Sequence, residues 1–291
     1  MLQVARLAPR LLGESSDLVR DFLRGQLVEG HEEGGFKDRS GAPDLYYTVF
    51  GLEGLIALRA DLPAAGVAAY LRGFGDGEGL DFVHLTCLAR CWAALPPEYR
   101  SELPCERIAA RIEAHRTVDG GYDASPGAER GTVYGCFLAL GAYQDLALEL
   151  PDPHGLLRCI AALRAEDGGY ANQHEMPLGL TPPTAAAAAM LRQLGEPAQP
   201  ELAEWLLERC HPEGGFFATP LAPLPDLLST ATALHALAGM HADLGRIREP
   251  CLDFIDTLWT NDGGFYGSWA EEELDCEYTY YGLLALGHLA V

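Results

Sequence analysis

The chain has 291 residues and a formal net charge of -22, with 48% hydrophobic and 9% aromatic residues. Such acidity argues against nucleic acid and anionic membranes as partners, because both are polyanions that require a basic surface. No stretch reaches the roughly 18 uninterrupted apolar residues of a membrane span. Arginines interrupt the apolar residues at positions 1–10, unlike a signal peptide. We therefore expect a protein without a membrane span.

The eight cysteines favour a cytoplasmic location. They stand singly among apolar residues, and none belongs to a CxxC pair. This usage is typical of reduced, buried thiols in a cytosolic protein, so we expect no disulfide.

A glycine pair followed by an aromatic residue recurs along the chain. The copies are Gly34-Gly35-Phe36, Gly120-Gly121-Tyr122, Gly168-Gly169-Tyr170, Gly214-Gly215-Phe216 and Gly263-Gly264-Phe265. Their first glycines are 86, 48, 46 and 49 residues apart, and the first interval contains a degenerate copy, Glu-Gly-Leu, at residues 78–80. Six repeats with a period in the range of about 20–50 residues are typical of a repeat architecture. Because the repeat is even, we expect a single domain over residues 1–291.

Each repeat reads as an amphipathic helix, a glycine turn, an irregular loop and a second helix that is apolar on all sides. In the first repeat, Ser15-Ser16-Asp17 can cap a helix that runs to roughly residue 27. The later amphipathic helices are expected at residues 64–73, 107–115, 155–164, 201–210 and 252–260. The apolar helices are expected at residues 46–58, 85–95, 132–146, 184–194, 229–240 and 277–289. No segment alternates with period two, so we expect almost no sheet.

The apolar helices predict the overall architecture. A helix without a polar face must be surrounded by protein, so these helices form an inner layer and the amphipathic helices an outer one. An open array would need polar caps at both ends, yet the last helix is strongly apolar over residues 280–286. We therefore predict an all-α barrel that closes on itself, with six inner helices around a central cavity and the turns gathered at one rim.

These turns, about 48 residues apart and followed by apolar helices, resemble the prenyltransferase and squalene-cyclase repeat. The resemblance covers nearly the whole chain and implies an α/α toroid, also called an α6/α6 barrel. The superfamily includes protein prenyltransferase β subunits, terpene cyclase domains and toroids with other functions. The function therefore has to come from the site.

The first repeat resembles the segment with which β subunits bind zinc and an isoprenoid diphosphate. In Gly34-Gly35-Phe36-Lys37-Asp38-Arg39 and the following Pro43-Asp44-Leu45-Tyr46-Tyr47, Asp44 falls on the zinc Asp. Tyr47 and Arg39 fall on the diphosphate Tyr and Arg. In the next repeat, Asp81-Phe82-Val83-His84 resembles the run that carries the zinc His.

Two departures from the family pattern concern the metal and the diphosphate. Tyr46 stands where the family has its zinc cysteine, and the diphosphate lysine has no counterpart. Asp44 and His84 alone are too few ligands for zinc, so a third would have to come from Asp81, Cys87 or Cys91. The alternative is that His84 and the two thiols simply pack in a helix interface.

Acidic residues before the inner helices have a plain alternative role. Asp44, Asp226 and Asp275 can each be an N-terminal cap. The late run Asp275-Cys276-Glu277-Tyr278-Thr279 is similar to the zinc motif of β subunits but places its cysteine differently. The Asp-x-Asp-Asp motif with which terpene cyclases protonate a substrate is absent, and we interpret residues 271–275 as a solvated loop.

Aromatic residues on the apolar helices are candidates for a substrate pocket. In an ordinary bundle they would be core residues. A toroid encloses more space than short side chains fill, so inward aromatics would line an apolar pocket suited to an isoprenoid or acyl chain. The candidates are Tyr47, Phe50, Trp92, Tyr134, Phe137, Tyr278 and Tyr281.

Two functional hypotheses follow. The first is a bacterial-looking prenyltransferase that binds an isoprenoid diphosphate in the cavity and transfers the chain to an acceptor. The resemblance then implies that Arg39 and Tyr47 stabilise the departing diphosphate, that Asp44 and His84 hold zinc, and that a helical α-subunit-like protein is a partner. The second is a non-catalytic toroid that carries a lipid or docks a protein.

Overall fold

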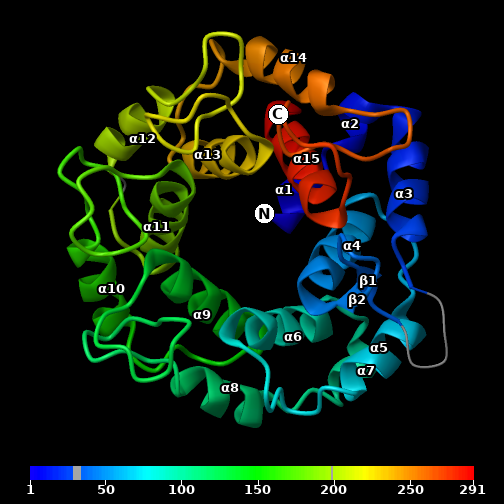
Figure 1. Cartoon of the computed structure of the whole chain (residues 1–291), viewed down its shortest axis with the longest axis vertical. Coiled ribbons are helices and arrows are strands. Elements are labelled where there is room, and N and C mark those ends of the chain that lie inside the picture. The colour runs from blue at the N-terminus through cyan, green and yellow to red at the C-terminus, as the bar shows by residue number, and fades with distance from the viewer. Residues whose placement is uncertain (29–33, 198) are drawn as a thin grey trace.

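The structure, a computed structural model, describes residues 1–28, 34–197 and 199–291 and consists of two rings of helices (Figure 1). The inner ring holds α4 (Leu45–Ala57), α6 (Phe82–Ala94), α9 (Val133–Asp145), α11 (Thr181–Gln193), α13 (Leu227–Gly239) and α15 (Cys276–Leu289). The outer ring holds α3 (Ser15–Gly25), α5 (Ala64–Arg72), α8 (Cys105–Glu113), α10 (Pro153–Ala162), α12 (Pro200–Leu207) and α14 (Arg248–Leu258). The short helices are α1 (Leu2–Ala5), α2 (Pro9–Leu12) and α7 (Pro97–Arg100).

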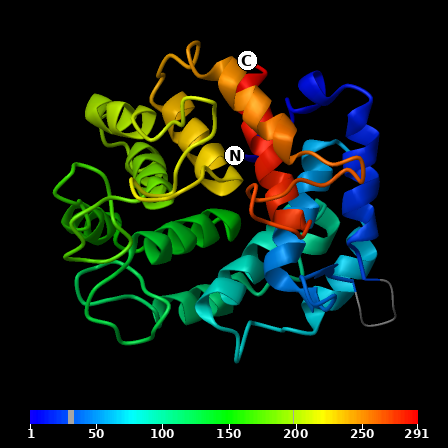
Figure 2. The same cartoon turned by 45° about the horizontal axis from the view of Figure 1, so that its top comes forward.

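The inner ring is closed. Each inner helix packs against the next one in the chain, and α15 packs against α4 (Figures 1 and 2). Closure also joins the outer ring, because the turn at Gly263 lies against the carbonyl of Leu18 in α3. The last inner helix is thereby covered, with Tyr280, Leu283 and Leu284 buried. The predicted all-α toroid of inner and outer helices is confirmed.

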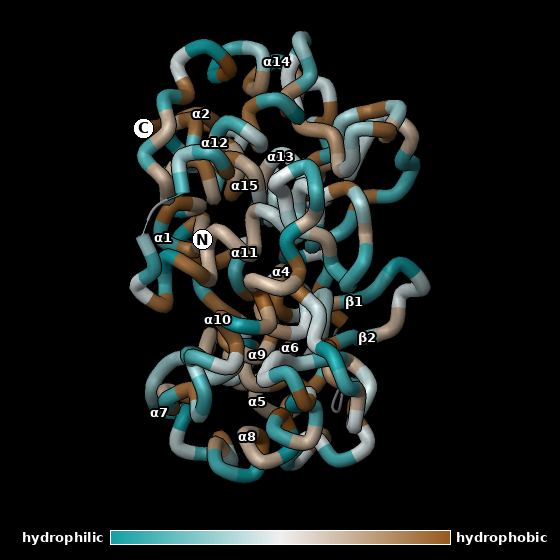
Figure 3. The backbone as a smooth tube through the Cα atoms, turned by 90° about the vertical axis from the view of Figure 1, so that its left-hand side faces the viewer, coloured by the Kyte–Doolittle hydropathy of each residue, from teal (hydrophilic) through white to brown (hydrophobic). Residues whose placement is uncertain are grey.

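The outer helices are amphipathic, as their sequences predict. Helix α3 buries Val19 and Leu23, whereas Asp17 and Arg20 form a surface ion pair. Along the backbone, hydrophilic stretches gather mainly in the loops (Figure 3). No helix in the described ranges is long and apolar enough to cross a membrane.

The turns hold the inner helices by a repeated hydrogen bond. After each of four glycine pairs, the backbone N–H of the aromatic residue donates to a threonine hydroxyl on the inner helix of the same repeat. The pairs are Phe36 with Thr48, Tyr170 with Thr184, Phe216 with Thr230, and Phe265 with Thr279. The first turn also contains the two-stranded antiparallel sheet of β1 (Phe36–Lys37) and β2 (Pro43–Asp44), which agrees with the expectation of almost no sheet.

Acidic N-caps begin several of the inner helices at the rim. The carboxylates of Asp44, Asp226 and Asp275 accept hydrogen bonds from the backbone N–H groups three residues later. Asp81 does the same for α6, so this helix begins at Phe82, earlier than the predicted residue 85. The capping role proposed for the three aspartates is therefore confirmed, and their side chains lie at the rim.

The glycine pairs differ in how closely they approach the next repeat, and this predicts unequal effects of substitution. Gly214 and Gly168 have φ values of 96° and 89°, a region that costs an alanine about 1–2 kcal/mol. A Cβ on Gly214 would also overlap the carbonyl oxygen of Pro250 in α14, whereas one on Gly168 meets nothing within 4 Å. We expect Gly214→Ala to lower the free energy of unfolding by about 3 kcal/mol or more and Gly168→Ala by about 1–2 kcal/mol. Urea unfolding checks this, and equal losses would contradict it.

Candidate functional site

A cavity of about 680 Å³ lies within the inner ring. Its size falls inside the range of about 300–1,000 Å³ that is typical of small-molecule sites. Each inner helix contributes one stripe of side chains. On α4 the stripe is Tyr46, Val49, Phe50 and Glu53, whose spacing of three or four residues places them on one helix face.

Aromatic rings form much of the cavity wall. The ring of Phe50 lies 4.9 Å from that of Tyr46 and 5.5 Å from that of Tyr281, measured between centroids. Tyr134 and Phe137 extend this wall from α9. The structure therefore brings four of the candidate aromatic residues, Phe50, Tyr134, Phe137 and Tyr281, into one apolar cavity.

The prediction that Trp92 lines the cavity is corrected. Helix α6 faces the cavity with Thr86, Cys87 and Arg90. Trp92 follows Arg90 by two residues, about 200° around the helix, and is 2% exposed in the packed core. Tyr47 and Tyr278 are likewise offset by one residue from the lining residues Tyr46 and Glu277, so they lie beside the cavity.

Arg39 lies at the rim, where acidic residues hold it. Its Nε donates to Asp275 at 3.0 Å and its Nη1 donates to Glu271 at 3.3 Å. Its guanidinium also lies 5.6 Å from the centroid of the Tyr278 ring. The interpretation of residues 271–275 as a solvated loop is therefore wrong for Asp275, which is 3% exposed.

Electrostatics at this part of the rim favour neutral or positive groups. Burial and the nearby charge of Asp275 raise the pKa of Tyr47 to about 12. Burial also raises the pKa of the Asp275 carboxyl, although its hydrogen bonds with Arg39 and the Tyr278 N–H oppose this. Arg39 is thus neutralised by the protein itself.

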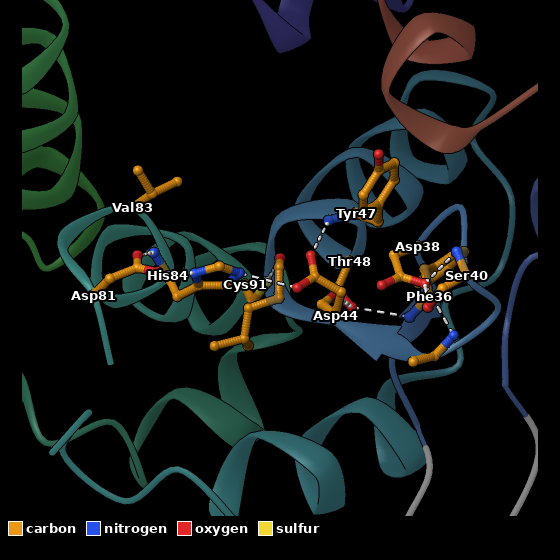
Figure 4. Close-up of polar contacts among 12 residues, drawn as sticks. Phe36, Asp38, Ser40, Asp44, Tyr47, Thr48, Asp81, Val83, His84 and Cys91 are labelled. Atoms are coloured by element: carbon orange, nitrogen blue, oxygen red, sulfur yellow. Dashed lines mark hydrogen bonds and ion pairs between the residues drawn. The ribbon is translucent and has the colours of Figure 1, made fainter. Parts of the chain in front are cut away.

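His84 joins the starts of two inner helices (Figure 4). Its Nε2 lies 2.9 Å from Asp44 Oδ2, and its Nδ1 lies 2.8 Å from Asp81 Oδ2. Burial acts to lower the pKa of His84, but the hydrogen bonds to Asp81 and Asp44 raise it overall. The predicted proximity of Asp44 and His84 is therefore found, with Asp81 on the other side of the ring.

The neighbouring thiols do not join this cluster. Cys91 is fully buried, and its Sγ lies 3.6 Å from the carbonyl oxygen of Leu45. Cys87 lines the cavity, and burial raises its pKa to about 12, so it is a neutral thiol at pH 7. Both thus fit the packing alternative.

Four charged residues in the cavity were missed from the sequence. Glu53 and Arg90 form a two-point ion pair, with distances of 2.6 and 3.0 Å. Glu277 accepts a hydrogen bond from the Tyr46 hydroxyl at 2.5 Å, and burial raises its pKa to about 7. Asp145 also lines the cavity. The available signal was a charge inside a helix that is apolar all round, because such a charge must be paired or face a cavity.

Comparison with known proteins identifies the family. The sequence matches the prenyltransferase alpha-alpha toroid domain over residues 14–84, 84–180 and 183–290. The chain belongs to this family. None of the curated proteins matches it.

Solved structures with different activities share the toroid fold. The type II terpene cyclase MstE from Scytonema, in complex with merosterolic acid A, is 14% identical with a TM-score of 0.63, and 97% of each chain is covered. Protein geranylgeranyltransferase-I of Candida albicans, complexed with GGPP, is 17% identical with a TM-score of 0.52, covering 99% of this chain and 83% of the other. An α-1,6-mannanase of Salegentibacter sp., in complex with α-1,6-mannotriose, is 11% identical with a TM-score of 0.63, and the match covers 96% of this chain and 98% of the other. At these identities the likeness shows the fold alone.

The zinc that protein prenyltransferases use can be tested against the donors in this toroid. Catalytic zinc sites take about three protein ligands. In the described part of the chain, no group of three His, Cys, Asp or Glu residues is arranged to hold a metal. Tyr46, at the family's cysteine position, donates instead to Glu277. This donor set does not support zinc at Asp44 and His84, so that prediction gains nothing from the structure, and the proposed function uses no metal.

Proposed function

We propose that this toroid binds an isoprenoid chain in its central cavity. The observation that carries the proposal is the aromatic wall of Tyr46, Phe50, Tyr134 and Tyr281 around a cavity of about 680 Å³. Such a wall buries apolar surface and presents aromatic faces to a long hydrocarbon. Two of the similar structures carry ligands named as GGPP and merosterolic acid A, which supports a hydrophobic ligand for this fold.

The charges around the cavity favour an isoprenoid without a diphosphate group. Arg39 at the rim is bound by Asp275 and Glu271, and Arg90 in the cavity is bound by Glu53. A diphosphate carries several negative charges and would have to compete with these carboxylates for both cations. We therefore infer a ligand whose polar end is uncharged or cationic.

Glu277 is the acid–base group of this proposal. Its pKa of about 7 means that a large fraction of the carboxyl keeps its proton at neutral pH. A group with such a pKa can give a proton to a bound molecule and take one back. The proposal thus includes proton chemistry on the ligand, and binding without conversion corresponds to the non-catalytic toroid of the second hypothesis.

Native mass spectrometry tests the proposal with geranylgeraniol, geranylgeranyl diphosphate and α-1,6-mannotriose. We expect a one-to-one complex with geranylgeraniol, weaker binding of the diphosphate, and none of the sugar. The variant Ala186→Phe places a ring in the cavity and should weaken geranylgeraniol binding about tenfold or more. Ala69→Phe, at an exposed position of α5, is the matched control and should bind normally. Equal binding by both variants would place the ligand elsewhere.

Prenyl transfer from a diphosphate is the second candidate. It is favoured by one observation: Arg39 and Tyr47 lie near each other at the rim, with Asp44 and His84 at the adjacent helix starts. This candidate predicts tighter binding of geranylgeranyl diphosphate than of geranylgeraniol, and loss of that preference in Arg39→Gln. The α-subunit-like partner that the resemblance implies stays a prediction that belongs to this candidate.

A further inference from the structure

The end of the cavity opposite the rim is polar, and we call Glu53, Arg90 and Asp145 its floor. The inner helices begin at the rim, and these three residues lie in the later turns of α4, α6 and α9. Gln193 and His235 line the same end from α11 and α13. Glu53 at this end is 5% exposed, and an isoprenoid chain alone gives no reason for a charge there, since burying it costs free energy.

Two of the floor charges cancel. Glu53 is 5% exposed, and its carboxylate accepts hydrogen bonds from both Nε and Nη2 of Arg90. This two-point geometry is typical of arginine–carboxylate pairs. The guanidinium has further N–H groups beyond these two, so it can still donate to a ligand oxygen. The pair is therefore neutral overall but remains a hydrogen-bond donor.

Asp145 adds a further negative charge to the floor, where the N-terminal amine of Met1 also lines the cavity and lies near Glu53 and Arg90. Within the described residues the carboxylate of Asp145 has neither a hydrogen-bond partner nor an ion pair, although it lines the cavity. Burial raises its pKa to about 6, and the nearby charge of Arg90 opposes this rise. At neutral pH or above, the floor thus presents an ionised carboxylate that lacks a donor. Glu277 near the rim differs, because Tyr46 already donates to it.

We propose that the floor recognises the hydrogen-bond-donating end of the ligand, a hydroxyl or an ammonium group, and that the chain extends from there toward the aromatic wall. An ammonium would pair with Asp145, whereas a hydroxyl would donate to Asp145 and accept from Arg90. A carboxylate end would add a second negative charge beside Asp145 and be rejected. This inference rests on the proposed function, because it uses the same cavity.

The test compares three ligands with one C20 chain: geranylgeraniol, geranylgeranylamine and geranylgeranoic acid. Affinities are measured by native mass spectrometry and calorimetry at pH 8, where Asp145 is ionised. We expect the alcohol and the amine to bind at least about tenfold more tightly than the acid. The order of the alcohol and the amine then distinguishes a hydroxyl ligand from an ammonium ligand.

The variant Asp145→Asn assigns the preference to the floor. Asparagine keeps the shape and an acceptor oxygen but removes the charge. The ratio of the affinities for the amine and the acid should therefore fall by about tenfold, while the affinity for the alcohol should change little. The unfolding midpoint of the variant shows that it is folded. Equal affinity of the protein for all three ligands, or an unchanged ratio in Asp145→Asn, would overturn the inference while leaving the proposed function standing. Failure of all three to bind would overturn both.

Discussion

Replacing Arg90 with methionine is expected to lower the free energy of unfolding by about 3 kcal/mol. The change leaves the carboxylate of Glu53, which is 5% exposed, buried without its partner. Removing one member of a buried ion pair costs about 3–5 kcal/mol, and we take the lower figure because the Arg90 side chain is 31% exposed. Urea unfolding at pH 7 measures the loss.

The double variant Glu53→Gln with Arg90→Met is the control for this prediction. It removes both charges together, so most of the lost stability should return, since no buried charge is left unpaired. Conversely, a double variant as unstable as the sum of the two single variants would show that the pair is energetically uncoupled. The role of the Glu53–Arg90 ion pair would then be to bind the ligand rather than to stabilise the fold.

The fold could be predicted from local signals in the sequence. The glycine pairs recur at a nearly constant interval, and each is followed by a helix that is apolar on every side. Both features belong to a few consecutive residues, and closure followed from the need to bury the last helix. The hydrogen bonds from the turns to Thr48 and its counterparts were not predicted, although Thr184, Thr230 and Thr279 each follow their aromatic partner by 14 residues, a spacing that could have found them.

The candidate site was only partly predictable, because its polar contacts join distant parts of the chain. Arg39 pairs with Asp275, 236 residues away, and Arg90 pairs with Glu53 on another helix. Similarity to the β-subunit motif predicted that Arg39 lies at the site but did not predict its partner Asp275. For the aromatics, the sequence indicated which helices face the cavity, but the error at Trp92 arose from the helix phase. A shift of two residues turns a side chain from the cavity into the core.

Two buried histidines should each remove stability as the pH drops from 7 to 5, because they stay neutral in the folded chain. His235 Nδ1 lies 3.0 Å from His288 Nε2, and their side chains are 9% and 6% exposed. Burial, together with the positive charges of the N-terminal amine and Arg192, lowers their pKa values to about 3 and about 4. One ring then donates to the other, an arrangement that protonation of both would break.

The sign of this pH dependence follows from proton binding. An unfolded histidine takes up a proton near pH 6.5, whereas these two do so only near pH 4 and below, so the unfolded state binds more protons in between. Each histidine should therefore remove about 2 kcal/mol of stability between pH 7 and pH 5. Burial of Glu277 and Asp145 acts in the opposite direction, because it raises their pKa values. Only a comparison of variants isolates the histidines.

Urea unfolding of the protein and of His288→Gln at pH 7 and pH 5 makes that comparison. Glutamine keeps a donor and an acceptor but takes up no proton, so the variant should lose about 2 kcal/mol less between the two pH values. His241→Gln, on the exposed turn after α13, is the matched control and should lose as much as the parent protein. The same loss in all three proteins would mean that His288 is protonated in the folded state. The polar end of the cavity would then carry positive charge near pH 6, and the preference expected for a donor ligand there would weaken as the pH falls.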